Sequence, residues 1–209
     1  MTLQLTTLSA QITDWANRQD WSPALVQSFI TMAEQKMNSD LRIDRMLQTS
    51  DNVVTVRCST LPDNWLEMYL AFIQNPAGPN GYLPIRYKSN DEFFNLIDWR
   101  SYGYYTIVGR VINFGGPPDA LEGIPYQIVY YSEVPPLNDT TDSWVYTKYP
   151  NLYLWAALGN AALHAVGEEA SAANFTGLAD ALVAKLNMDW LRAKASGSRV
   201  TKTRMRSFG

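Results

Sequence analysis

The sequence predicts an α+β protein, in which an α-helical bundle is built from the N- and C-terminal segments and an antiparallel β-rich domain, barrel-like or sandwich-like, is inserted between them. Two observations predict this class. Apolar residues recur at helical spacing near both ends of the chain, whereas β-branched and aromatic residues alternate through the middle. We expect residues 1–50 and 147–194 to form the bundle, 51–146 the β-rich domain, and 195–209 an extended basic C-terminal arm.

Two helices are expected in the first quarter of the chain. Leu8, Ile12 and Trp15 share one face of the first helix. The second helix begins with Ser22 as N-cap and Pro23 at the first helical position. Its apolar stripe is Val26, Phe29, Ile30, Ala33, Met37 and Leu41. We expect this helix to continue to residue 47, which makes it roughly 39 Å long.

The middle of the chain has the alternation typical of strands. Residues 53–58 and 126–131 each predict a strand, and 104–114 predicts a hairpin that turns at Gly109 and Arg110. Residues 65–72 are expected to form a strand or a short helix. Ser89 and Glu92 form a capping box, so a short helix is expected over 89–99.

Two more helices are expected in the last third of the chain. The first has Pro150 in its first turn and Gly167 at its end. Its expected face is Leu152, Trp155, Gly159, Leu163 and Val166. The last helix runs from Ser171 to Lys194, after which Gly197 is expected to end regular structure. Its expected stripe is Phe175, Leu178, Leu182, Leu186 and Trp190.

Groups suited to catalysis or to metal binding are scarce. The chain has one histidine, His164, and one cysteine, Cys58, and it contains no metal-binding or phosphate-binding motif. Asp139 and Asp142 are more typical of turns and caps than of a cation site. We therefore expect no enzyme activity, no catalytic residue, no metal and no cofactor, a structural His164, and a Cys58 that fills a small space in the core. The N-terminal segment lacks the pattern of a signal peptide, and no apolar run approaches the about 20 residues of a membrane span.

Charge is distributed unevenly along the chain. All 20 acidic residues lie at or before Asp189, so residues 1–189, with 11 basic residues, carry a formal charge of −9. Residues 190–209 contain six basic residues and no acidic residue, a formal charge of +6. Such a tail could serve solubility, bind nucleic acid, or dock into an acidic groove on another protein.

Apolar residues within the tail favour docking over the other two roles. Basic side chains would steer association, and apolar side chains would fix the register. The residues expected to form this arm are Arg199, Lys202, Arg204, Met205, Arg206 and Phe208.

Aromatic residues are abundant, and they suggest two kinds of surface. Trp15, Tyr153 and Trp155 exceed what one core stripe requires, so we expect them at an interface between subunits. Tyr102, Tyr104, Tyr105, Tyr130 and Tyr131 could stack on bases or sugars, although tyrosines also fit half-buried strands. Alternative functions are therefore a nucleic-acid-binding protein that uses the tail, or a carbohydrate-binding β module.

Four stretches of the chain resemble, in order and spacing, the head-to-tail adaptor (connector) proteins of tailed bacteriophages, especially the short-tailed type. They are ITDWANRQDWSPALVQSFITMAEQKMNSDLR, LPDNWLEM, YYTIVGRVINFGGPPDA followed by YQIVYYSEVPPL, and WVYTKYPNLYLWAALGNAALH. Together they cover most of residues 11–164, and the C-terminal tail lies outside them.

The resemblance implies a structural protein of the virion, assembled in the host cytoplasm. It implies a homo-oligomeric ring of twelve subunits beneath the portal protein, at the capsid vertex. The ring would extend the DNA channel and attach the tail nozzle and fibres, and double-stranded DNA would pass through it without specific binding. The basic arm would then lock the adaptor onto the portal, and no membrane would be involved.

Overall fold

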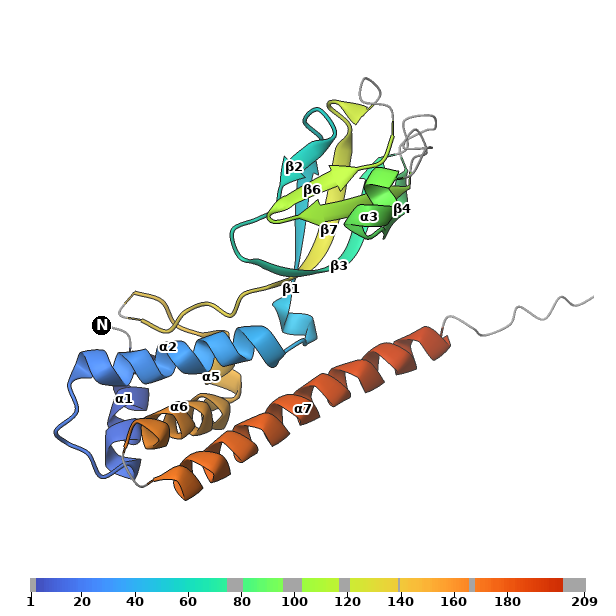
Figure 1. Cartoon of the computed structure of the whole chain (residues 1–209). Coiled ribbons are helices and arrows are strands. Elements are labelled where there is room, and N and C mark those ends of the chain that lie inside the picture. The colour runs from blue at the N-terminus through green and yellow to red at the C-terminus, as the bar shows by residue number, and fades with distance from the viewer. Residues whose placement is uncertain are drawn as a thin grey trace, which may run out of the picture. The chain divides into compact units, whose positions relative to one another are not determined.

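The computed structural model describes residues 3–74, 81–95, 103–116, 121–138, 140–165 and 168–200. The chain forms two compact units: unit 1 is Met1–Asp44 with Val134–Gly209, and unit 2 is Arg45–Glu133. Unit 1 is helical and unit 2 holds the sheet (Figure 1). The predicted α+β class is confirmed, because helices from both ends of the chain flank the strands.

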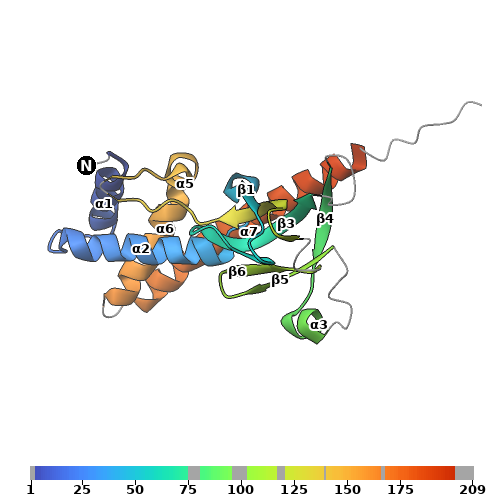
Figure 2. The same ribbon diagram turned by 90° about the horizontal axis from the view of Figure 1, so that it is seen from above.

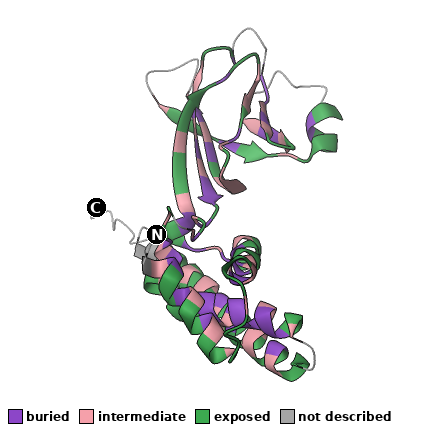
Figure 3. Ribbon diagram, turned by 90° about the vertical axis from the view of Figure 1, so that its left-hand side faces the viewer, coloured by how far each residue is buried: buried purple, intermediate pink, exposed green. Residues whose placement is uncertain are grey.

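Unit 1 is organised around one central helix, α6. Its helices are α1 (Leu3–Trp15), α2 (Pro23–Asp40), α5 (Trp144–Lys148), α6 (Pro150–His164) and α7 (Glu169–Val200). Helix α6 lies between α2 and α7 (Figures 1 and 2). Most of its side chains are buried, and buried residues of unit 1 gather where its helices meet (Figure 3). Alanine residues and Gly159 on α6 leave room for its neighbours to approach closely.

Helix α2 begins as the sequence predicts but ends earlier. The Ser22 hydroxyl accepts a hydrogen bond from the Leu25 N–H (3.3 Å), which confirms the N-cap. All six residues of the predicted apolar stripe are buried. The predicted extension to residue 47 is wrong, because the helix ends at Asp40 and the backbone of Leu41 is in an extended conformation. The Asn187 side chain on α7 caps the C-terminal end of α2. Its amide nitrogen donates to the Asp40 carbonyl (2.8 Å), and its amide oxygen accepts from the Arg42 N–H (2.8 Å).

Helices α6 and α7 pack closely at one glycine. A Cβ added to Gly159 would lie 2.7 Å from the Thr176 Oγ1 and 3.3 Å from the Thr176 backbone nitrogen. The predicted stripes of both helices are partly wrong, because Leu163 is 68% exposed and Leu178 is 39% exposed. The line of α7 that is buried or half-buried is Ala172, Thr176, Ala179, Val183, Leu186 and Trp190.

Gly197 does not end regular structure, contrary to the prediction. Helix α7 has 32 residues and continues to Val200. A single glycine inside a helix costs about 1 kcal/mol relative to alanine, which is too little to stop a helix that many preceding turns support. The segment 195–200 is therefore helical rather than extended.

Unit 2 is a seven-stranded sheet that curls into a nearly closed barrel. Its strands are β1 (Leu47–Val53), β2 (Cys58–Thr60), β3 (Trp65–Gln74), β4 (Tyr82–Tyr87), β5 (Tyr104–Val108), β6 (Val111–Phe114) and β7 (Pro125–Ser132), in the order β1-β7-β3-β4-β5-β6-β2. A 3-10 turn, η1 (Asp44–Met46), leads into β1. The largest fully buried side chains of the barrel include Tyr126, Phe114, Leu61, Ile112 and Leu121.

The sheet is antiparallel except between β4 and β5. These two strands pair in parallel at Arg86 with Tyr104 and at Tyr87 with Tyr105. Parallel neighbours need a crossover connection, and here the connection contains α3 (Asn90–Asn95), which contacts β5 (Figure 2). The Glu92 N–H donates to the Ser89 hydroxyl (3.3 Å), so the predicted cap of this helix is confirmed.

Two turns of unit 2 differ in how well the sequence predicted them. The β5–β6 hairpin turns at Gly109 with φ +61°, as predicted. The predicted strand over 53–58 is wrong, because β1 ends at Val53 and the chain reverses at Val56 and Arg57. Both residues have positive φ (+55° and +100°), which is uncommon for residues with a side chain.

Candidate assembly surfaces

The basic arm starts on a helix. Arg199, the first residue of the predicted arm, belongs to the last turn of α7. The other five arm residues, Lys202, Arg204, Met205, Arg206 and Phe208, lie outside the described residues. Helix α7 therefore includes the first residue of the predicted arm.

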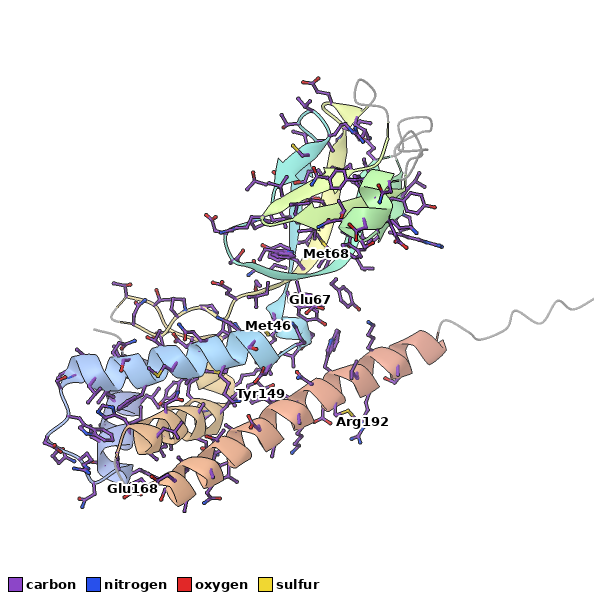
Figure 4. The ribbon with its side chains drawn as sticks, in the orientation of Figure 1. Met46, Glu67, Met68, Tyr149, Glu168 and Arg192 are labelled. Carbon is purple, nitrogen blue, oxygen red and sulfur yellow. The ribbon has the colours of Figure 1, made fainter. Side chains whose placement is uncertain are left out.

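Trp15 lies on the surface, as an interface residue should. It is 61% exposed at the C-terminal end of α1. Beside it lies a cavity of ≈ 320 Å³, which is lined by Trp15, Trp21 and Phe175 among others. Glu168, immediately before α7, also lines this cavity (Figure 4). Trp155, on α6, is half-buried.

Tyr153 serves the interior of unit 1. Its side chain is fully buried, and its hydroxyl donates a hydrogen bond to the Glu34 carboxylate (3.1 Å). Burial raises the pKa of the Tyr153 phenol, and the neighbouring Glu34 charge raises it further. A side chain that is fully covered within one copy has no surface left for a second copy. Tyr153 is therefore not available for contact with a second copy.

Polar side chains on α2 hold the segment that enters unit 1 after the barrel. The Leu137 N–H donates to the Glu34 carboxylate (2.6 Å), and the Leu137 carbonyl accepts from the Gln27 amide (3.0 Å). One turn further along α2, the Asn38 amide oxygen accepts from the Val134 N–H (2.8 Å). Burial raises the pKa of the Glu34 carboxyl above its ordinary value of 4.5, against the opposing effect of the hydrogen bonds from Leu137 and Tyr153.

Helix α7 has two apolar lines with the same heptad spacing. We call the line that is buried or half-buried the inner seam: Ala172, Thr176, Ala179, Val183, Leu186 and Trp190. The inner seam packs on α6, as the contact between Gly159 and Thr176 shows. We call the second line the outer seam: Gly177, Ala181, Ala184, Met188, Leu191 and Ala195.

Every residue of the outer seam is exposed. Met188 is 50% exposed and Leu191 is 55% exposed, and a Cβ added to Gly177 would meet no atom within 4 Å. Each outer residue lies five positions after an inner one, which turns the outer seam about 140° around the helix from the inner seam. The charged residues Lys185, Asp189 and Arg192 lie outside both seams.

The outward surface of α1 and α2 is nearly free of charge. Among the described residues of α1 and of α2 up to Gln35, Asp14 is the single exposed charged side chain. A groove of ≈ 520 Å³ runs between these two helices, and most of its wall consists of small side chains. They are Thr6, Ser9, Ala10, Thr13, Pro23 and Ala24. Depletion of charge is typical of the core of protein interfaces.

The remaining residues that the sequence offered for chemistry or ligand binding are His164, Cys58 and the tyrosines of the sheet. His164 is exposed, with its ring 5.6 Å from that of Phe29. Cys58 is half-buried beside a cavity of ≈ 370 Å³ in unit 2. Tyr105, Tyr130 and Tyr131 are buried in the sheet, which leaves them unable to form a stacking platform.

Among the described residues, no three His, Cys, Asp or Glu side chains come together as metal ligands would. Likewise, in the described part of the chain, no helix combines the length and the apolar character needed to cross a membrane.

Sequence reasoning missed the outer seam of α7, although the signal was present. A search for one apolar stripe selects the largest side chains, and it chose Leu178 and Leu182. Small residues at heptad spacing are easily passed over in this way. A test for two heptad lines separated by five residues would have found both seams.

Comparison with known proteins gives the family. No curated protein matches the chain. The family model described as SU10 adaptor protein matches residues 3–205, which is nearly the whole chain and includes both units and all of α7. This agrees with the resemblance to phage adaptors found in the sequence. The chain belongs to the SU10 adaptor protein family and is a structural adaptor of a bacteriophage.

Proposed function

We propose that this protein forms a ring of twelve copies beneath the portal of a short-tailed phage. In this position it extends the channel through which DNA enters and leaves the capsid. It also provides the platform on which the tail nozzle and fibres assemble. The observation that carries the proposal is the match to the SU10 adaptor family over residues 3–205.

The charge distribution supports the same role. Residues 1–189 carry a formal charge of −9, and a protein surface with this sign repels the phosphates of passing DNA rather than binding them. The basic arm has the opposite sign, so it is suited to an acidic site on the portal. In this proposal the arm locks each copy to the portal, and DNA passes the ring without specific contacts.

A count of copies tests the proposal. Cryo-electron microscopy of the purified protein mixed with the portal of its phage should show a twelve-fold ring stacked on the portal. Mass measurement on intact particles should give the same copy number. One or two copies per particle, or a ring that does not touch the portal, would contradict the proposal.

A further inference from the structure

Helix α7 is built to pack between two partners, and unit 1 supplies one of them. An amphipathic helix with a single apolar face needs one partner. Here the inner seam covers α6, while the outer seam, with the same heptad spacing, faces solvent. Heptad spacing of apolar residues is the pattern that accepts a second helix by knobs-into-holes packing. Small residues at four of the six positions allow the axes of the two helices to approach closely.

The same unit offers an uncovered surface of matching character. The groove between α1 and α2 has walls of small side chains. Among the described residues of α1, and of α2 up to Gln35, Asp14 is the single exposed charged side chain. Helix α7 touches α2 in the C-terminal half of α2, where Lys36 pairs with Asp180 (2.7 Å), whereas the groove lies at the N-terminal end of α2. The outer seam and the groove are therefore two different patches on one unit, which is what a ring of identical copies requires.

We propose that the outer seam of α7 in one copy packs into the α1–α2 groove of the next copy. This inference rests on the proposed ring. Met188 and Leu191 are the large side chains that fill the groove, and Gly177, Ala181 and Ala184 allow the α1 and α2 backbones to come close. None of the residues of the outer seam and none of those that line the groove is charged, so the contact itself buries no unpaired ion.

The size of the seam indicates when this interface forms. From Gly177 to Ala195 the helix rises about 27 Å, and a strip of one helix diameter, about 10 Å, covers about 270 Å² in projection. Each partner of a standard stable interface gives about 800 Å². The seam is therefore too small to hold a ring together on its own. It closes the ring once the copies are arrayed on the portal.

Crosslinking between differently labelled copies tests the contact. In a Cys58→Ser background, one protein carries Ala184→Cys in the seam and another carries Ala10→Cys in the groove. The two are mixed with the portal and treated with a short bismaleimide. We expect crosslinked adaptor dimers from this mixture and none from Ala184→Cys alone. Ala193→Cys is the matched control, because Ala193 is exposed on α7 outside the outer seam.

Other occupants of the seam would show themselves in the same experiment. Crosslinks from Ala184→Cys to the portal, or between two Ala184→Cys copies, would overturn the proposal. A ring that forms normally and gives no crosslink between seam and groove would also overturn it.

A charge placed in the seam tests its energetic role. The double variant Ala181→Glu with Ala184→Glu should keep the helical circular dichroism and thermal midpoint of the monomer, because both positions are exposed. The adaptor concentration needed to half-fill the portal should rise at least about tenfold, since the interface would then bury unpaired charges. Ala193→Glu should leave that concentration unchanged.

The outcomes separate this inference from the proposed function. If the wild-type chain forms no assembly with the portal, both fail. If the wild-type ring forms and the double variant fills it equally well, only the inference about the seam fails. An equal loss in Ala193→Glu and in the double variant would also overturn it.

Discussion

At the level of single residues, Glu34 is a buried carboxylate that joins two segments of unit 1. It is 6% exposed, yet its carboxylate accepts hydrogen bonds from the Leu137 N–H and the Tyr153 hydroxyl. Through Leu137 it holds the segment that follows the barrel against α2. The two hydrogen bonds stabilise the charged carboxylate, whereas its burial disfavours the charge. Burial is the larger effect, so the pKa of Glu34 is raised.

Removal of the Glu34 carboxylate should destabilise unit 1. Glu34→Ala leaves the buried Leu137 N–H and the Tyr153 hydroxyl without their acceptor, which should cost about 1–3 kcal/mol for an unsatisfied buried group. The measurement is urea denaturation followed by helical circular dichroism. Gln35→Ala is the control, since Gln35 is exposed next to it and should change the free energy of unfolding by less than about 0.5 kcal/mol.

The raised pKa of Glu34 predicts a specific dependence on pH. Above its folded-state pKa, the folded protein carries the cost of a buried charge that the unfolded chain does not. As the pH falls through that value, the folded protein takes up the proton first, and the cost disappears toward the ordinary pKa of 4.5. The free energy of unfolding of the wild type, relative to Glu34→Gln, should therefore rise as the pH falls from 7. A difference that stays constant with pH would contradict this.

At the scale of helices, one glycine sets the distance between α6 and α7, and a second glycine serves as its control. Gly159→Ala places a Cβ 2.7 Å from the Thr176 Oγ1 and 3.3 Å from its backbone nitrogen, so the Thr176 side chain must shift and the α7 backbone must give way slightly. Overpacking of this kind costs about 1–3 kcal/mol, more than the about 1 kcal/mol that alanine gains over glycine in a helix.

Gly177→Ala should have the opposite sign. No atom lies within 4 Å of the added Cβ, so the monomer should gain up to about 1 kcal/mol from helix propensity alone. Thermal denaturation of the two variants side by side tests both signs. A stabilised Gly159→Ala would show that the two helices are not in close contact.

Another pair of variants on α6 separates its true packing from the pattern in the sequence. Leu163, which the sequence placed on the inner face, is 68% exposed, whereas Leu158 is 2% exposed. Leu163→Asp should therefore be tolerated within about 0.5 kcal/mol. Leu158→Asp buries an unpaired charge and should unfold unit 1. The thermal midpoint of each variant measures these two effects. A Leu158→Asp variant as stable as the wild type would contradict the register of α6.

These helices show what the sequence could and could not predict. The stripe of α2 and its N-cap followed from local rules, because this helix has one apolar face and a Ser-Pro start. The ends of α2 and α7 could not be found locally. Asn187, far away in the sequence, ends α2. On α6, buried residues lie around most of the circumference, so no single apolar stripe could describe how this helix packs.

At the scale of the whole molecule, the strands were easier to predict than the surfaces. Alternation identified the β5–β6 hairpin, but nothing local showed that Val56 and Arg57 would turn with positive φ. Among the residues predicted at the subunit interface, Trp15 is exposed and Tyr153 is buried. The difference arises because an aromatic residue suits a core and an interface equally well. Only the fold decides between them.

The proposed role of the arm is to hold the adaptor on the portal, and a shortened chain tests it. A fragment of residues 1–200 should fold normally, because α7 is complete at Val200 and the outer seam is intact. Its binding to the portal should fall sharply, since the arm is proposed to be the lock. A tail that binds DNA instead would leave portal binding unchanged and lower only the affinity for DNA. Undiminished portal binding by the fragment would exclude the docking arm.

Two full-length variants should divide the roles of charge and apolar contact within the arm. Changing Arg199, Lys202, Arg204 and Arg206 to Ser should slow association with the portal and remove its dependence on salt, because opposite charges act mainly by steering the encounter. Changing Met205 and Phe208 to Ser should instead speed dissociation, since apolar contacts form after the encounter. Surface plasmon resonance at low and high salt measures both rates. If the two variants changed the same rate by the same factor, the arm would not act as a steered anchor, and its charges and apolar residues would share one role.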